Sequence, residues 1–287
     1  NGTARATGWE SRSAPENFYG AQRKAGRFFS GRLGKRPDGA MSVDRGTHSR
    51  VRTDCRPLRE ENRTELLAIV IATLIPGLLW LLFFYRRDRF EAEPPWLVLR
   101  AFVYGSVSIV PAIAVELPFQ RFLVAPSSEA DRLLVIFVVV GLGEELAKFA
   151  ATYLAVWHSR HFNEVMDGIV YAVAAALGFA TVENVVYTSV FGLHVAPARA
   201  LVASLAHACF SGVMGFYLGW GRLSASRPGP AIAFGIGVAA ALHGAYDYLL
   251  LSGWAPPAVA LAMVAGLYAL LSRKIRQAVR LSPFRRD

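Results

Sequence analysis

Ionisable side chains interrupt segments of this chain that are otherwise long and apolar. They are Glu144, Glu145, Lys148, Glu183, His207, His243 and Asp247. A charge at mid-bilayer costs from about 2.5 to more than 10 kcal/mol, so such residues usually face a bundle interior or a water-filled cavity. Carboxylates and imidazoles that meet there can bind a divalent metal or activate water as general bases. The residue types therefore predict one buried site with hydrolytic or metal-binding chemistry.

The spacing of these residues puts several of them on shared helix faces. Glu144 and Glu145 precede Lys148 by four and three residues, so both carboxylates can reach its ammonium group. His243 and Asp247 are also four apart, and the acid can fix the imidazole tautomer and raise the basicity of the ring.

Structural explanations compete with the catalytic one for each residue taken alone. Glu145 with Lys148 can be a neutralising ion pair, and an isolated His207 can simply hydrogen-bond to a neighbouring helix. Asp167 stands at the start of an apolar segment, where it can cap a helix or complement its dipole. The case for a shared site rests on the whole set.

Long apolar segments must position these groups. At 287 residues and 54% hydrophobic content, the chain is too apolar for an ordinary soluble domain. Runs of about 20 apolar residues match the length of a spanning helix, and they lack the alternation of a β-barrel. We expect an all-α, polytopic transmembrane bundle of about seven spans, at Leu66–Tyr85, Trp96–Leu117, Leu133–Trp157, Asp167–Phe191, Ala198–Trp220, Ala231–Leu251 and the short Pro256–Leu271.

The depth of the ionisable residues within these spans supports a single site. If the third span starts at membrane side A, Glu144 lies roughly 17 Å below that side. Glu183 lies roughly 23 Å along the returning fourth span, and His207 roughly 14 Å in from side A. His243 and Asp247 lie roughly 18 and 24 Å from the opposite side B. All of them fall at compatible depths, so we expect them to meet.

Basic, polar segments flank the predicted bundle. Residues 1–63 predict a disordered basic tail, residues 64–272 a transmembrane domain, and residues 273–287 a basic C-terminal tail. The net charge of +10 lies mostly in these tails and in loops, as in membrane proteins, so we expect no nucleic-acid partner. Cys55 and Cys209 fall in unlike segments and predict no disulfide framework. We expect an integral protein of the bacterial plasma membrane.

The order of these motifs resembles that of the PrsW-type intramembrane proteases, within the wider group of CAAX prenyl proteases and Abi proteins. The wider group has a histidine where Glu183 stands, a departure that the PrsW proteins share. The resemblance covers roughly residues 64–272. It rests on Glu144-Glu145-Leu-Ala-Lys148, Phe179-Ala-Thr-Val-Glu183-Asn184, His207 and His243-Gly-Ala-Tyr-Asp247, with Asp167-Gly-Ile-Val-Tyr171 and Asp88-Arg-Phe-Glu91 in support.

The resemblance implies a peptidase that cleaves a membrane-embedded or membrane-anchored protein, such as an anti-sigma factor, within the lipid bilayer. It implies Glu144, Glu145, His207 and His243 as catalytic residues. A divalent metal such as zinc would be held by His207, His243, Asp247 and Glu183, with Lys148, Asn184 and Phe179 in supporting positions.

Two questions stay open from the sequence. Glutamate-activated water can act with or without metal assistance. Buried Glu and His residues can also serve a proton-coupled transporter or a non-catalytic membrane scaffold. A transporter favours inverted repeats and broken helices, which the sequence does not show.

Overall fold

The computed structural model describes residues 56–88, 90–224, 226, 228–253 and 255–285. This part of the chain is helical, with no β-strand among the described residues, which confirms the all-α fold class. Residues 1–55 of the predicted tail 1–63 lie outside the described residues. The first described helix, α2 (Arg56–Tyr85), begins at Arg56.

Apolar helices of membrane-spanning length dominate the fold. Among the described residues six stretches are long and apolar enough to cross a bilayer. They are Arg63–Tyr85 in α2; Pro95–Leu123, which joins α3 (Pro95–Glu116), η1 (Leu117–Phe119) and α4 (Gln120–Val124); α7 (Val165–Phe191); Leu193–Leu223, which joins η3 (Leu193–Val195), α8 (Ala196–Ala198), η4 (Arg199–Ala203) and α9 (Ser204–Ser224); α10 (Pro228–Ser252); and α11 (Pro257–Leu281).

The predicted third span has a different character. Residues 129–156 are helical as α5 (Glu129–Leu134), the π-helical η2 (Val135–Gly141) and α6 (Leu142–Val156). This segment is not among the six apolar stretches because Glu144, Glu145 and Lys148 interrupt its middle. The last span is longer than expected, since α11 continues to Leu281 through residues assigned to the C-terminal tail.

Helix α7 forms the centre of the bundle, and its side chains are buried along most of its length. It packs against α9, α3, α2, α11 and α6. Gly178 lets α7 approach α3 closely, because a Cβ atom there would lie 1.9 Å from the Phe102 carbonyl oxygen. The equivalent atom on Gly105 of α3 would lie 1.9 Å from the Ala175 carbonyl oxygen. Small residues thus set the α3–α7 distance, as in many membrane helix pairs.

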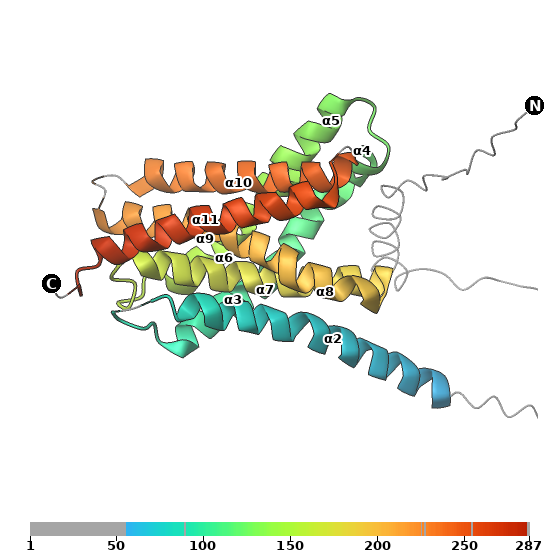
Figure 1. Ribbon diagram of the computed structural model, residues 1–287, viewed down its shortest axis with the longest axis horizontal. Coiled ribbons are helices and arrows are strands. Elements are labelled where there is room, and N and C mark those ends of the chain that lie inside the picture. The colour runs from blue at the N-terminus through green and yellow to red at the C-terminus, as the bar shows by residue number, and fades with distance from the viewer. Residues whose placement is uncertain (1–55, 89, 225, 227, 254, 286–287) are drawn as a thin grey trace, which may run out of the picture.

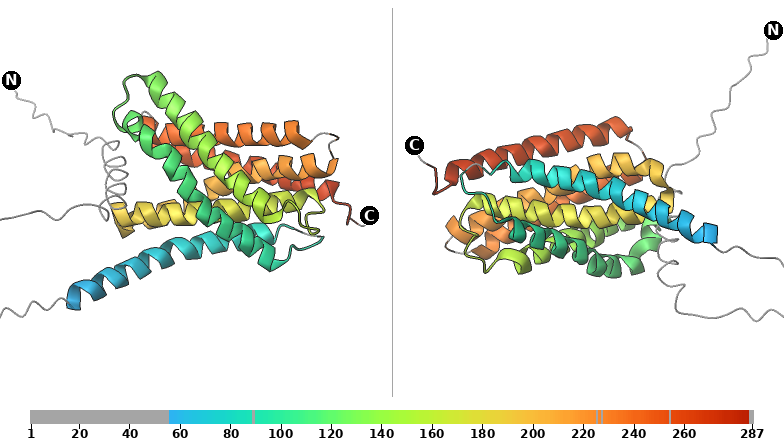
Figure 2. Two further views of the ribbon diagram at one scale, coloured as in Figure 1. Left: turned by 180° about the vertical axis from the view of Figure 1, so that it is seen from behind. Right: turned by 90° about the horizontal axis from the view of Figure 1, so that it is seen from below.

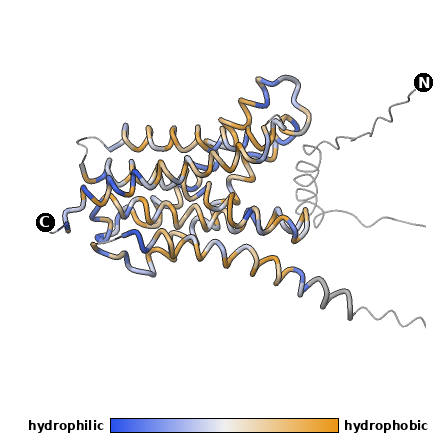
Figure 3. The backbone as a smooth tube through the Cα atoms, viewed as in Figure 1, coloured by the Kyte–Doolittle hydropathy of each residue, from blue (hydrophilic) through white to orange (hydrophobic). Residues whose placement is uncertain are grey.

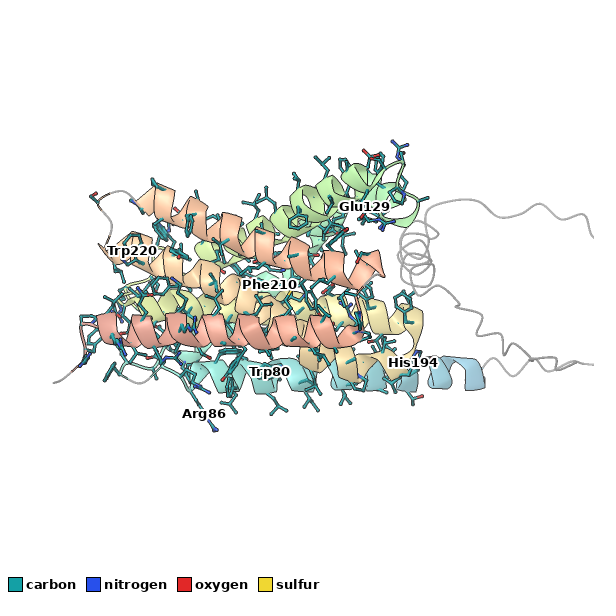
Figure 4. All side chains as sticks on the ribbon, turned by 45° about the horizontal axis from the view of Figure 1, so that its top comes forward. Trp80, Arg86, Glu129, His194, Phe210 and Trp220 are labelled. Atoms are coloured by element: carbon teal, nitrogen blue, oxygen red, sulfur yellow. The ribbon has the colours of Figure 1, made fainter. Side chains whose placement is uncertain are left out.

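The two ends of the bundle define the two membrane sides. Glu129 and His194 lie toward one end, side A, while Arg86 and Trp220 lie toward the other, side B (Figure 4). The middle part of the helices consists mainly of hydrophobic residues, and hydrophilic residues gather near the ends (Figure 3). The N-terminal end of α2 projects from the bundle on side A (Figures 1 and 2).

Candidate active site

Helix α6 carries the acidic pair into the protein interior. Glu144 and Glu145 stand in its first turn, directly after the π-helical segment η2. Such π segments are rare and often accompany functional sites. The Lys148 ammonium lies 3.0 Å from Glu144 Oε2 and 2.9 Å from Glu145 Oε1, and its side chain is fully buried. One lysine therefore neutralises part of the charge of both carboxylates.

The two glutamates differ in their surroundings. Glu145 is fully buried, and it accepts a hydrogen bond of 2.7 Å from the Ser211 hydroxyl on α9. Its Oε1 also lies 3.2 Å from His243 Nδ1. Glu144 has fewer fixed partners and lines a cavity, which Glu145 does not. Glu145 is thus held on several sides, whereas Glu144 faces space that a substrate or water can occupy.

His207 on α9 is placed between Lys148 and Glu183. Its Nδ1 lies 2.9 Å from Lys148 Nζ, and its Nε2 lies 3.1 Å from Glu183 Oε2 on α7. A lysine ammonium has only donors, so Nδ1 accepts, and the neutral ring carries its proton on Nε2. The Phe179 ring packs near the imidazole and beneath Lys148 Nζ, 4.4 Å from its centroid.

His243 on α10 completes the pair of imidazoles. Its Nε2 lies 3.4 Å from Asp247 Oδ2 and 3.7 Å from Glu144 Oε2. The two histidine rings are 5.0 Å apart and nearly perpendicular. Phe210 stacks on the His243 ring at 4.9 Å, in the middle of the bundle (Figure 4). The aromatic contact and the flanking acids fix the orientation of this imidazole.

Arg199 is the main site residue that the sequence reasoning missed. It starts the π-helical segment η4, and its guanidinium lies 3.0 Å from Glu183 Oε1. It also donates to Asn184 Oδ1 at 3.0 Å and stacks 3.6 Å over the Tyr187 ring. Asn184 in turn donates to the Ser204 hydroxyl at 2.9 Å. The missed signal was an arginine at the second position of a predicted span.

These groups open onto a cavity of about 820 Å³. Its walls are mainly apolar side chains from α3, α7, α10 and α11. The ionisable residues that line it are Glu116, Glu144, Glu183, Arg199, His207 and Asp247. This volume falls within the range of ordinary ligand pockets, about 300–1,000 Å³. An apolar cavity with a few converging polar groups suits an extended or unwound peptide segment within a membrane.

The donor atoms of the site also suit a divalent metal. Glu144, His207 and His243 each offer one ligand atom, and the three atoms lie within 4.8 Å of one another. Two imidazoles and a carboxylate with an open position form a typical hydrolytic zinc set. Among the described residues, the ion pairs of the site involve four carboxylates, those of Glu144, Glu145, Glu183 and Asp247. They involve only two permanent cations, Lys148 and Arg199. A divalent cation would neutralise that difference.

The structure thus brings all the predicted site residues of α6, α7, α9 and α10 together. Glu183 and Asp247, predicted as metal ligands, lie against His207 and His243 respectively, outside the three-residue group that contains Glu144. Ligation by these two acids stays a prediction. Ser211 and Phe210 join the site in addition to Arg199, and neither a serine nor a phenylalanine in an apolar helix gave a usable sequence signal.

The fold and the site define an integral membrane protein with a buried acid–imidazole centre that faces a cavity. A protein-family model, described as PrsW family intramembrane metalloprotease, matches residues 93–272. The chain therefore belongs to the PrsW family of intramembrane metalloproteases. This membership confirms the predicted enzyme class and favours it over the transporter and scaffold alternatives.

Curated relatives agree with this assignment. The chain is 35% identical to Protease PrsW of Geobacillus kaustophilus over 217 residues, which cover 74% of this chain and 93% of the relative. It is 36% identical to Protease PrsW of Bacillus subtilis over 192 residues, which cover 66% of this chain and 86% of the relative. These relatives are bacterial. No solved structure gives a significant match.

Proposed function

We propose that the cavity binds a segment of a membrane-embedded or membrane-anchored protein and that Glu144 activates the water that hydrolyses it. The observation that carries this proposal is the unequal placement of the two glutamates. Glu144 lines the cavity, while Glu145 is fully buried among Lys148, Ser211 and His243. A general base must reach the proton it removes, so Glu144 is the better placed of the two.

In this mechanism the Glu144 carboxylate takes a proton as water attacks the carbonyl carbon of the scissile peptide bond. The negative charge that develops on the carbonyl oxygen requires a donor, and His243 Nε2, 3.7 Å from Glu144 Oε2, is placed to supply one. His207, whose N–H faces Glu183, would have to turn from that carboxylate to supply a second. Glu144 then returns the proton to the leaving amine nitrogen as the carbon–nitrogen bond breaks. Lys148 and Glu145 hold Glu144 and His243 in place throughout.

A zinc ion fits the same residues. His207 and His243 would hold it with Glu144 beside them as the base, and the Glu183 and Glu145 carboxylates next to the imidazoles would orient the rings. When bound, zinc supplies Lewis-acid polarisation and lowers the pKa of a bound water. Glu144 faces the cavity in either case, so its replacement tests the site with or without metal assistance.

Mapping protein N-termini in bacterial membranes tests the proposed function. Cells that express the wild-type chain should show new termini inside or next to transmembrane segments of other proteins. Cells that express Glu144→Gln at the same level should lack them. The proposal fails if the wild-type chain creates no such termini relative to an empty vector, or if the Glu144→Gln variant creates the same set.

A further inference from the structure

A second group of carboxyls lies at side B, away from the catalytic cavity. Asp88 and Glu93 come from the loop between α2 and α3, and Asp167 comes from the first turn of α7. Each offers one oxygen, and these oxygens lie within 4.8 Å of one another. Glu164, which precedes α7, joins them by contact with the Asp88 carboxyl. This end of the bundle also carries Arg86 (Figure 4).

Helix capping explains only part of this cluster. Glu164 and Asp167 form a capping box at the start of α7. Asp167 Oδ2 accepts from the backbone N–H groups of Asn163 and Glu164 at 2.7 and 2.8 Å. The Tyr171 hydroxyl donates to Glu93 Oε2. These bonds satisfy one oxygen each of Glu93 and Asp167, and Asp88 takes no part in the capping box.

Several buried oxygens in the cluster have no donor. They are both carboxylate oxygens of Asp88, Oδ1 of Asp167, Oε2 of Glu164 and the side-chain Oδ1 of Asn163. Asp167 is 0% exposed and Glu164 is 1% exposed, so water does not readily satisfy these atoms. Buried polar atoms without partners are rare in folded proteins and need an explanation, and a bound cation is one that suits a group made only of oxygens.

The cluster also lacks a basic side chain to balance it. Among the described residues, none of its four carboxyls takes part in an ion pair with lysine or arginine. The nearby arginines have other partners: Arg100 donates to the Ala155 carbonyl and Arg222 to the Ser159 carbonyl. Burial, with repulsion from neighbouring carboxyls, raises the pKa of Asp88 and of Glu93 to about 7. Since no described lysine or arginine is ion-paired with these carboxyls, a bound cation can balance their charge.

We propose that Asp88, Glu93, Glu164 and Asp167 bind one divalent cation, with Ca²⁺ as the ion that fits best. The ligand atoms are all oxygens, which hard cations prefer, and the Asn163 amide oxygen is a neutral oxygen of the kind that Ca²⁺ sites use. A separation of up to 4.8 Å between oxygens equals about twice a Ca–O bond of 2.3–2.6 Å. Shorter Mg–O bonds of about 2.0–2.1 Å span this separation less well.

Such an ion would fasten the α2–α3 loop to the start of the central helix. Asp167 and Glu183 stand on the same helix, α7, sixteen residues apart, which corresponds to about 24 Å. The ion would therefore act on the stability of the bundle at side B rather than on the catalytic groups. The proposal does not depend on the role given to Glu144.

Calcium binding to the full chain in detergent, after chelator treatment, tests the proposal. We expect one saturable Ca²⁺ site per chain by calorimetric titration. A hundredfold excess of Ca²⁺ over Kd should raise Tm by about 5 °C or more. Asp88→Asn should weaken binding at least tenfold while keeping the fold, because asparagine removes the charge but keeps an oxygen that can face the Phe90 backbone N–H.

Two control variants separate this site from other acids. Glu129→Gln changes an exposed acid at side A, and Glu144→Gln changes the catalytic cavity; both should bind Ca²⁺ as the wild type does. The proposal is overturned if the wild-type chain shows no saturable Ca²⁺ binding, if Asp88→Asn binds equally well, or if Glu144→Gln abolishes binding. Saturable binding of Mg²⁺ without Ca²⁺ would overturn the choice of ion.

Discussion

Replacing Lys148 with methionine should destabilise the protein strongly. The ammonium is fully buried and contacts Glu144 Oε2 at 3.0 Å and Glu145 Oε1 at 2.9 Å. Removing one partner of a buried ion pair leaves an uncompensated charge and typically costs about 3–5 kcal/mol. For a domain of this size that loss corresponds to a fall in Tm of roughly 6–20 °C. Thermal unfolding of the detergent-purified protein measures it.

The matched variants test the cause of this loss. Lys148→Met with Glu145→Gln removes one carboxylate together with the lysine, so it should be more stable than Lys148→Met alone by about 1 kcal/mol or more. Lys274→Met removes a lysine that contacts the Tyr217 hydroxyl and the Phe216 ring, and it should lower Tm by a few degrees at most. A Lys148→Met protein no less stable than Lys274→Met would refute the electrostatic reasoning.

Three further predictions concern residues around the site and the fold. Arg199→Ala removes the ion-pair partner of Glu183, so the rate of cleavage in proteoliposomes should fall about tenfold or more. The Tm of this variant should change less than that of Lys148→Met. Gly178→Ala forces α7 away from the α3 backbone and should cost about 1–3 kcal/mol in thermal unfolding. When a chelator keeps divalent cations away, Asp88 and Glu93 have pKa values raised to about 7 in the folded protein. The folded protein therefore binds more protons than the unfolded chain between about pH 4 and 7. Its free energy of unfolding should therefore fall as pH rises through that range and level off above it.

Each of these predictions has a variant that can contradict it. Arg199→Lys keeps the charge but not the planar fork, so it should restore cleavage only in part; full activity in Arg199→Ala would remove this residue from the site. Gly237→Ala adds a methyl group in open space and should not destabilise. Asp88→Asn should flatten the pH dependence of Tm in chelator, and an unchanged slope would assign that dependence to other groups.

The depth of the ionisable residues could be predicted from the sequence because helix rise is nearly constant. Glu144, His207 and His243 are on different helices, yet counting residues from the span ends placed them at compatible levels. Their direction around each helix could not be predicted in this way. The π-helical segments η2 and η4 precede Glu144 and His207, and each extra residue in a turn rotates the helix that follows.

Charged residues near span ends were the main source of error in the sequence reasoning. Arg199, at the second position of the predicted span Ala198–Trp220, was given no role, although Glu183 and Asn184 hold it inside the site. The basic residues after Leu271 indicated a tail, but α11 continues because Ile275 and Ala278 still bury one face. A charge count detects where a helix leaves the apolar layer, but it does not detect where the helix ends.

The acid cluster at side B depended on tertiary structure in a different way. A helix cap was one of two structural interpretations of Asp167, and its side chain does take part in the capping box with Glu164. Asp88 and Glu93 belong to a loop with no periodic pattern, far from Asp167 in the chain. Only the packing of the α2–α3 loop against the start of α7 shows that these carboxyls share one place.

The initial rate of substrate cleavage by Glu144→Gln in proteoliposomes tests the central claim most directly. The substrate is a membrane protein whose new terminus depends on the wild-type enzyme, and the variant must match the wild type in Tm. Loss of a general base lowers rates by about 10²–10⁴-fold, so we predict at least a hundredfold loss. A Glu144→Gln enzyme that cleaves within a few-fold of the wild-type rate would contradict the assignment of Glu144.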